Sequence, residues 1–208
     1  MNIMEGIKIK GQKVKIPDTS RDEFPQFLVD MGYKVGAEIG VYKGEYTEKF
    51  CKVGLKMYAV DPWLIYEDYT NPKGQKRLDF QYEHTKRFLA PYDCTIVRKT
   101  SMDAVKDFAN ESLDFVYIDG NHTFRYVAED IFEWEKKVKK GGIVAGHDYI
   151  VASSAWSPCH VKYVVDAYIA SFHIQNLYLL DASNSNELVM GKDGKYKDRT
   201  RTWFWIKQ

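Results

Sequence analysis

Short apolar runs alternate with amphipathic stretches along most of the chain. The apolar runs predict five strands, at 35–41, 56–63, 94–99, 113–120 and 141–149. Between them, helical spacing is found around 46–53, at 75–90, at 101–109 and from Phe124 to Gly141. The last helix is predicted from a stripe of apolar residues at intervals of three and four, namely Phe124, Val127, Ile131, Trp134 and Val138. Nearly continuous apolar strands separated by helices predict a parallel sheet covered on both faces, which is a doubly wound α/β fold.

The two ends of the chain depart from this alternation. Residues 7–16 alternate isoleucine or valine with lysine around Gly11, which predicts a small hairpin. We therefore expect residues 1–18 to form an N-terminal hairpin appendage and residues 19–208 to form the main domain. A helix capped by Thr19 or Ser20 should follow and end near Met31. After Tyr149 the pattern predicts a helix near 159–171 and strands at 174–180 and 202–207, which are candidates for an antiparallel pair at one edge.

Composition narrows the class of protein. The 208 residues are 45% apolar and 28% charged, as in an ordinary globular protein with one core. Thirty basic residues against twenty-nine acidic ones leave a net charge of +1, so we expect no bulk binding of nucleic acid. No apolar run reaches the roughly 18 residues that span a membrane, and no secretory signal is evident at the start, so the protein is expected to be cytoplasmic. Cys51, Cys94 and Cys159 form no CxxC pair and are expected to be reduced thiols.

Candidate chemistry gathers where the predicted strands end. In an open α/β sheet, ligands bind beyond the carboxyl ends of the strands. The residues at these ends are Glu38 to Gly44, Asp61 to Trp63, Thr100 with Ser101, Asp119 to His122, and Gly146 to Tyr149.

The first of these turns has the pattern Glu-x-Gly-x-x-x-Gly, formed by Glu38, Gly40 and Gly44, and Asp61 lies 23 positions after Glu38. A dinucleotide site would have a glycine in place of Glu38, because a carboxylate repels a pyrophosphate. An acid there suits a ligand with an ammonium group and no phosphate, while Asp61 can accept hydrogen bonds from a ribose. S-adenosylmethionine (SAM) has both features. The alternative is that the glycines only ease the turn from strand to helix.

Three stretches resemble the class I SAM-dependent methyltransferases of methyltransferase family 24. They are AEIGVYKGEYTEKF, AVDPW and FVYIDGNHTFRYVAEDIFEWEKKVKKGGIVAGHDY, and the resemblance covers residues 35–150. It implies a seven-stranded sheet with an antiparallel final strand. It also implies a cofactor site formed by Glu38, Gly40 and Gly44 at the methionine end, Asp61 at the ribose, Ser101 and Met102 at the adenine, and Trp63 and Asp119 beside the cofactor.

The same resemblance implies a metal site. Related sugar O-methyltransferases bind a divalent cation through acids at the ends of the fourth and fifth strands, the places that Asp119 and Asp148 occupy here. His147 would be a third ligand for Mg²⁺ or Mn²⁺, and alternatively a structural histidine. This sequence has Asn121 and His147 where relatives commonly have acids.

His122 follows the fourth strand closely. A neutral histidine can accept the proton of an attacking hydroxyl, so we expect His122, with Asp119 and Asp148, to form the catalytic group. The alternative is that His122 caps the next helix. Aromatic residues flank the same mouth and could form a floor for a sugar or another ring; they are Trp63, Tyr66, Tyr69, Tyr149 and Trp156. The segment 63–70 is also expected to cover the cofactor as a mobile lid. Cys159 and His160 have no third ligand nearby and are interpreted as structural.

The leading interpretation is an O-methyltransferase acting on a hydroxyl of a small molecule, such as a sugar. One alternative is an oxidoreductase with a nucleotide cofactor, which Glu38 and the missing third glycine disfavour. The other is a module that binds a nucleoside without turnover. The pattern is compatible with a monomer or a homo-oligomer and indicates no membrane partner.

Overall fold

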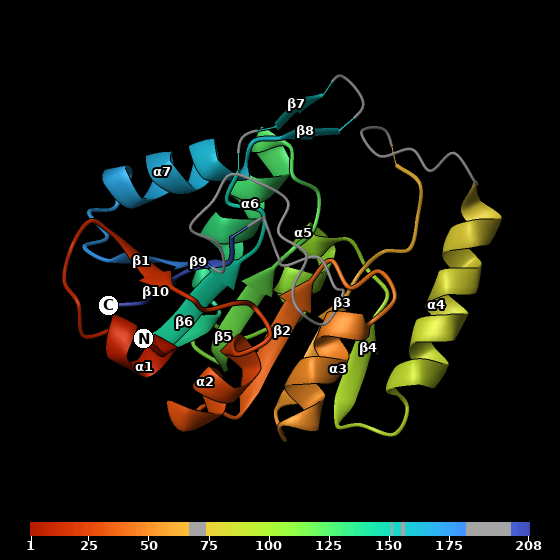
Figure 1. Ribbon diagram of the computed structural model, residues 1–208. Helices are drawn as coiled ribbons and strands as arrows, with labels where there is room; N and C mark the ends of the chain where they lie inside the picture. The colour runs from red at the N-terminus through yellow and green to blue at the C-terminus, as the bar shows by residue number, and fades with distance from the viewer. Residues whose placement is uncertain (67–73, 151, 155–156, 182–200) are drawn as a thin grey trace.

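Eight strands form one twisted sheet in the computed structural model (Figure 1), which describes residues 1–66, 74–150, 152–154, 157–181 and 201–208. From one edge to the other, the strands are β1 (Lys13–Pro17), β9 (Leu177–Asp181), β10 (Trp203–Ile206), β6 (Val138–Gly146), β5 (Leu113–Ile118), β2 (Val35–Ile39), β3 (Lys56–Val60) and β4 (Cys94–Val97). All neighbouring pairs are parallel except those of β10, which is antiparallel to both β6 and β9. The predicted doubly wound α/β fold is therefore confirmed.

Helices cover both faces of the sheet. One face carries α5 (Ser101–Ala104), the 3₁₀ turn η1 (Val105–Asp107), α6 (Phe124–Glu135) and α7 (Val161–Ser171), which pack on strand residues such as Val116 and Ile118. The opposite face carries α1 (Ile3–Gly6), α2 (Phe24–Asp30) and α3 (Glu45–Lys52), packed on Phe115 and Tyr117. Helix α4 (Gln75–Leu89) packs near β3 through Leu78 and Leu89. Strands β7 (Ala152–Ser154) and β8 (Ser157–Cys159) form a separate small hairpin.

The expected N-terminal hairpin is wrong. Residues 13–17 form β1, which pairs in parallel with β9 and buries Val14 and Ile16. Alternating isoleucine and lysine fits either arrangement, but the edge of β9 offers both main-chain hydrogen bonds and an apolar face that a two-stranded hairpin lacks. Strand β1 is also the reason why the sheet has eight strands instead of seven. The expected antiparallel pairing of β9 with β10 is confirmed, but the expected place of the pair at one edge of the sheet is wrong, because β1 pairs with the outer side of β9 and β10 lies between β9 and β6.

Two helix boundaries also differ from the prediction. Helix α2 begins at Phe24, not near Thr19, whose hydroxyl instead donates to the carbonyl oxygen of Ile16 at 2.6 Å. Helix α6 ends at Glu135, and Val138 already belongs to β6, opposite Leu113. Val138 follows Trp134 at a helical interval, so spacing alone assigned it to the helix.

Strands β2, β3 and β5 end two or three residues before the predicted ends. Loops at the carboxyl ends of these strands are therefore formed by residues 40–44, 61–63 and 119–122, which can contact a ligand there. No described helix is both long and apolar enough to cross a membrane. The three cysteines are free thiols, as expected.

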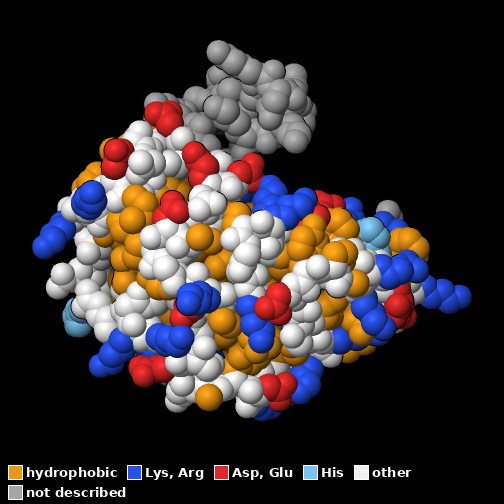
Figure 2. Space-filling model, turned by 90° about the horizontal axis from the view of Figure 1, so that it is seen from below, with side chains coloured by type: hydrophobic (Ala, Val, Ile, Leu, Met, Phe, Trp, Pro, Cys, Tyr) orange, Lys and Arg blue, Asp and Glu red, His pale blue; other side chains and the backbone are white. Residues whose placement is uncertain are grey.

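The surface turned toward the viewer in Figure 2 mixes its charges. Over the described part of that face, basic and acidic side chains alternate with hydrophobic ones, and no patch of a single sign extends across it. The even distribution agrees with the near-zero net charge.

Candidate active site

A cleft of about 410 Å³ opens at the carboxyl ends of the central strands. This volume lies within the range of small-molecule sites. The expected residues that line it are Gly40, Asp61, Trp63, Ser101, Met102 and Asp119. The remaining lining residues are Ile39, Tyr42, Val60, Pro62, Leu64, Tyr66, Leu78, Thr100, Gly120, Asn121, Arg125, Tyr126, Glu129 and Asp130.

Glu38 and Gly44 do not belong to the described lining of the cleft. Glu38 is buried, and its carboxyl accepts a hydrogen bond from the Thr47 hydroxyl. Burial raises the pKa of Glu38 to about 8. Gly44 has a φ of +82° at the start of α3, and a Cβ there would come within 3.1 Å of Leu89 and Thr85. Both residues therefore shape the turn under the cleft.

Gly40 allows two strand ends to meet. Its φ is +92°, and a Cβ on this residue would lie 2.3 Å from the carbonyl oxygen of Asp119. Only glycine permits both this backbone conformation and this approach. The glycine thus brings the loop after β2 against the loop after β5, at the wall of the cleft.

Asp61 organises the adjoining loop. Its Oδ2 accepts hydrogen bonds from the backbone N–H groups of Val41 at 3.0 Å and Tyr42 at 2.9 Å, and its Oδ1 accepts from that of Trp63 at 2.8 Å. Burial raises the pKa of the Asp61 carboxyl, and these three donors oppose the effect. The indole N–H of Trp63 donates to the carbonyl oxygen of Tyr42, which fixes the buried ring beside the cleft.

Ser101 connects the cleft to a buried acid that was not predicted. The Ser101 Oγ accepts from the indole N–H of Trp134 at 2.8 Å, so its hydrogen is donated to Asp130. Burial raises the pKa of Asp130 to about 7. A sequence signal existed, because position 130 falls within the apolar stripe of α6, between Val127 and Trp134.

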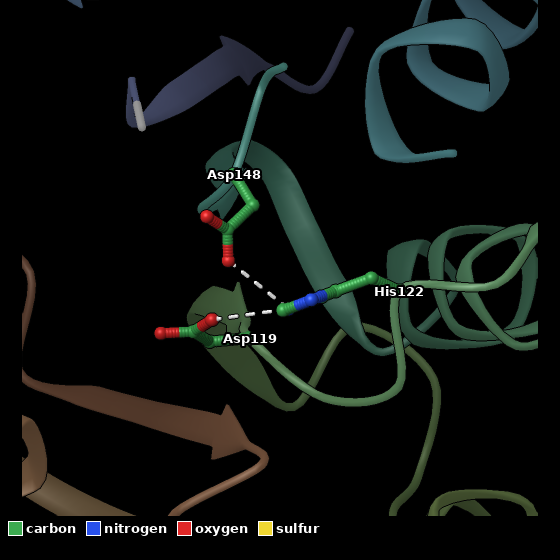
Figure 3. Close-up of side chains that lie close together, drawn as sticks. All are labelled: Asp119, His122 and Asp148. Atoms are coloured by element: carbon green, nitrogen blue, oxygen red, sulfur yellow. Dashed lines mark ion pairs between the residues drawn. The ribbon is translucent and has the colours of Figure 1, made fainter. Parts of the chain in front are cut away.

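Asp119, which lines the cleft, converges with His122 and Asp148 (Figure 3). The Nε2 atom of His122 lies 3.1 Å from Oδ2 of Asp148 and 3.6 Å from Oδ1 of Asp119. One ligand atom from each residue lies within 4.8 Å of the others, so the three could hold a metal ion. Burial lowers the pKa of His122, but the two carboxylates outweigh this effect and raise it above its ordinary value.

His122 also carries an orphaned atom. Within the described structure, its buried Nε2 has no hydrogen bond of acceptable geometry, although the carboxylates are close. The expected alternative, that His122 caps α6, is not what the contacts indicate, since Nδ1 of His160 accepts from the backbone N–H of Phe124 at 3.0 Å. Once Nε2 has lost its hydrogen, its lone pair and the two carboxylates together could bind one divalent cation.

His147 lies behind the carboxylates. Its Nδ1 is 3.4 Å from Oδ2 of Asp148 and 3.9 Å from Oδ1 of Asp119, and its Nε2 is 3.3 Å from a guanidinium nitrogen of Arg21. Because a guanidinium can only donate, a hydrogen bond between these two groups requires Nε2 as the acceptor and the hydrogen on Nδ1. Among the described residues, the ligand atoms that lie within 4.8 Å of one another belong to Asp119, His122 and Asp148 and do not include one of His147. His122 is therefore a better third ligand than the expected His147.

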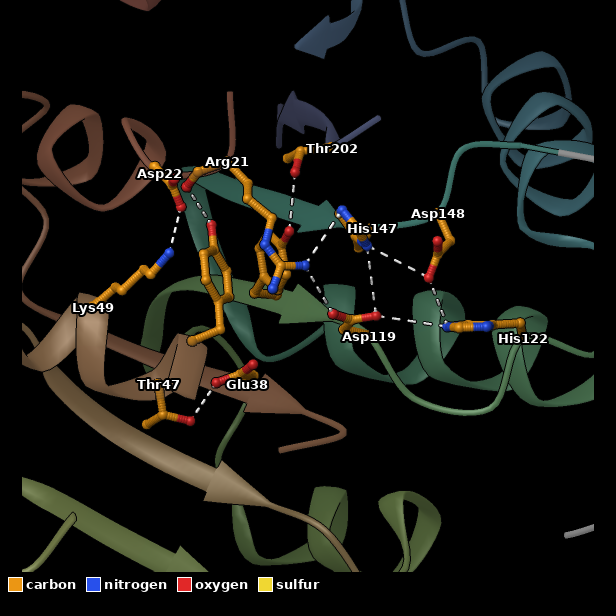
Figure 4. A network of polar contacts seen from close by, with 12 residues as sticks. Arg21, Asp22, Glu38, Thr47, Lys49, Asp119, His122, His147, Asp148 and Thr202 are labelled. Carbon is orange, nitrogen blue, oxygen red and sulfur yellow. Dashed lines mark hydrogen bonds and ion pairs between the residues drawn. The ribbon is translucent and has the colours of Figure 1, made fainter. Parts of the chain in front are cut away.

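Arg21 was not among the expected site residues. It precedes α2, on a segment that the sequence assigned to a helix, and an arginine there carries no motif. Its guanidinium approaches Asp119 at 3.6 Å and His147 at 3.3 Å (Figure 4).

Only some residues of the expected aromatic floor lie in the described part of the structure. Tyr66 lines the cleft, where its hydroxyl accepts a hydrogen bond from the Asn121 amide at 3.2 Å. Tyr149 is buried, and its hydroxyl donates to Asp166, away from the cleft. Tyr69 and Trp156 lie outside the described residues, as do residues 67–70 of the expected lid.

Comparison with known proteins identifies the fold and the family. Residues 37–149 match the family model described as a methyltransferase domain, of the family 24 type. The uncharacterized protein y4gI of Sinorhizobium fredii is 24% identical over 117 residues, which are 53% of this chain. The match covers only 12% of that relative's length.

Solved structures with the same fold are distant in sequence. The O-methyltransferase TomG from Streptomyces achromogenes, in complex with SAM, has a TM-score of 0.60 and 12% identity, over 90% of this chain and 79% of that one. An O-methyltransferase from Bacillus cereus, in complex with S-adenosylhomocysteine (SAH), has a TM-score of 0.56 and 15% identity, over 90% and 80%. Precorrin-6y C5,15-methyltransferase from Geobacter metallireducens has a TM-score of 0.56 and 11% identity, over 89% and 87%.

Proposed function

The chain belongs to the methyltransferase domain family of the family 24 type. From this premise we propose that it is a class I SAM-dependent methyltransferase, which methylates a hydroxyl group of a small molecule with the help of a divalent cation. The observation that carries the proposal is the convergence of His122 and Asp148 with Asp119, which lines the cleft.

The cleft suits SAM. Its volume and the close backbone approach at Gly40 fit an extended nucleoside. Asp61 accepts three hydrogen bonds, and a carboxylate has about four acceptor positions, so one stays available for a ribose hydroxyl. Met102, also in the lining, offers an apolar surface to the adenine. Bound SAM supplies a methyl group already activated on a sulfonium.

The cluster of Asp119, His122 and Asp148 suits a hydroxyl acceptor. Methyl transfer is a displacement in line with the leaving sulfur, so the chain must orient the attacking oxygen and help it lose a proton. A sugar hydroxyl is a very weak acid, for which one histidine is a poor match. Asp119, Asp148 and Nε2 of His122 offer the hard oxygen ligands and the imidazole that Mg²⁺ or Mn²⁺ accepts. A cation held there would supply Lewis acidity that lowers the pKa of the hydroxyl.

The proposal is tested by measuring SAH release from SAM with a panel of monosaccharides and catechols. We expect turnover that EDTA abolishes and Mg²⁺ or Mn²⁺ restores. Asp148→Asn should lose the response to metal while keeping its affinity for SAH, and Asp107→Asn, a surface acid paired with Lys99, is the matched control. Full turnover in EDTA would reject the cation and leave His122 as the proton acceptor. Absence of turnover with every hydroxyl acceptor, despite SAH binding, would contradict O-methylation.

The proposal extends to partners and location. We expect the protein to act on a small-molecule acceptor in the cytoplasm, with neither nucleic acid nor membrane as a partner. Sedimentation measures whether it is a monomer or a homo-oligomer.

A further inference from the structure

Arg21 is held firmly at the back of the site. Its side chain lies over the ring of Tyr46, with the guanidinium carbon 4.4 Å from the ring centroid. The hydroxyl of the same tyrosine donates to the carbonyl oxygen of Arg21 at 2.8 Å. Tyr46 is itself buried in α3 and packs against Phe50 and Tyr117. Tyr46 therefore fixes both the backbone and the charged end of Arg21.

The two oxygens of the Asp119 carboxylate face different neighbours. Nη1 of Arg21 lies 3.6 Å from Oδ2 of Asp119, whereas Oδ1 lies 3.6 Å from His122 and 3.9 Å from His147. A carboxylate that pairs through one oxygen cannot rotate without losing that attraction. The ion pair with Arg21 thus turns Oδ1 toward the proposed cation site.

The same nitrogen approaches His147. Nη1 of Arg21 lies 3.3 Å from Nε2 of His147, and because arginine only donates, this contact keeps hydrogen off Nε2. The opposite nitrogen, Nδ1, lies 3.4 Å from Oδ2 of Asp148, so a hydrogen on Nδ1 would face this carboxylate. Residues that fix the orientation of a ligand and its tautomer commonly decide how well a metal site works.

We propose that Arg21 is a positioning residue, which acts on the site through Asp119 and His147: it turns one carboxylate oxygen to the cation and keeps His147 in the tautomer that donates to Asp148. The cation part of this inference rests on the proposed function, whereas the tautomer part does not.

The tautomer is tested by NMR of imidazole nitrogens in ¹⁵N-histidine-labelled protein, with the signals of His147 assigned through His147→Gln. In the wild type we expect hydrogen on Nδ1 alone. Arg21→Met keeps an apolar stem over Tyr46 but has no donor, so Nε2 should acquire hydrogen. The matched control is Lys49→Met, which removes a second cation lying 6.0 Å from the same ring and paired with Asp22. Lys49→Met should leave the wild-type signals unchanged.

The orientation of Asp119 is tested with Arg21→Lys, because this variant keeps the charge and loses the planar fork. Binding of Mn²⁺ in the presence of SAH, followed by electron paramagnetic resonance, should weaken by about 10- to 100-fold. The conservative change also provides a folded protein if Arg21→Met does not fold.

Three results would overturn the inference. The first is hydrogen on Nε2 of His147 in the wild type, and the second is an unchanged tautomer of His147 in Arg21→Met. The third is Mn²⁺ affinity in Arg21→Lys equal to that of the wild type. If the wild type binds no Mn²⁺, the cation part of the proposed function fails, and the role of Arg21 is then decided by the tautomer of His147 alone.

Discussion

Replacing Asp61 by asparagine tests how the loop after β2 is held. The aspartate accepts three backbone hydrogen bonds, from Val41 and Tyr42 at one oxygen and from Trp63 at the other. The oxygen of an asparagine can keep the first two, but its amide group then faces the N–H of Trp63, donor against donor. A lost hydrogen bond to a charged group costs about 1.5–3 kcal/mol, and an unsatisfied buried donor costs about 1–3 kcal/mol. Because burial already disfavours the charge of Asp61, part of this loss is regained, and we expect a net destabilisation of about 2–4 kcal/mol.

Urea unfolding measures this change, and Asp107→Asn on the surface is the control. Affinity for SAH, measured by calorimetry, should fall about tenfold or more in Asp61→Asn, since one bond to a ribose hydroxyl contributes about 1.4 kcal/mol or more. A free energy of unfolding within about 0.5 kcal/mol of the wild type would refute the role assigned to the carboxylate. Lost stability with unchanged SAH affinity would refute the contact with ribose.

Three other substitutions test the surrounding structure by urea unfolding. Gly40→Ala would place a Cβ 2.3 Å from the carbonyl oxygen of Asp119 at a φ of +92°, so a loss of about 3 kcal/mol or more is expected; a tolerated alanine would mean that the two strand ends do not meet. Burial raises the pKa of Asp130 to about 7, above its value in the unfolded chain, so this carboxyl favours the folded state at low pH and loses that contribution as the pH rises toward 7. Asp130→Asn should therefore gain about 1–3 kcal/mol relative to the wild type between about pH 5 and about pH 8, and parallel pH profiles would contradict the burial of the acid. Ile16→Ala should cost about 2–5 kcal/mol because Ile16 is fully buried in β1, whereas the exposed Ile9→Ala should change little; equal small effects would restore the hairpin interpretation.

The sequence predicts the cleft well because strand ends are local features. The end of an apolar run lies within a few residues of the end of a strand, and Gly40, Asp61 and Asp119 directly follow strands, while Ser101 lies four residues after β4. Parallel strands bring their carboxyl ends to one edge, so the four residues meet although 79 positions separate the first from the last.

The remaining features depend on contacts that no local pattern encodes. The alternation of apolar and basic residues in Lys13–Pro17 is the same for a hairpin strand and for a strand added to a sheet, and its partner β9 starts at Leu177. Val138 follows Trp134 at a helical interval, yet pairing with Leu113 places it in β6. Only the tertiary structure distinguishes these alternatives.

The position of β1 in the sheet explains how Arg21 reaches the site. Strand β10 is antiparallel to both β6 and β9, so β9 runs in the same direction as β6, and β1, which is parallel to β9, does too. The carboxyl end of β1 therefore opens on the same edge of the sheet as the loops after β5 and β6, and the chain that leaves Pro17 arrives beside Asp119 and His147 four residues later. A hairpin appendage would give the N-terminal segment no such direction. Strand β1 thus has a functional consequence as well as a structural one, because it places the guanidinium of Arg21 beside the acidic residues that follow β5 and β6.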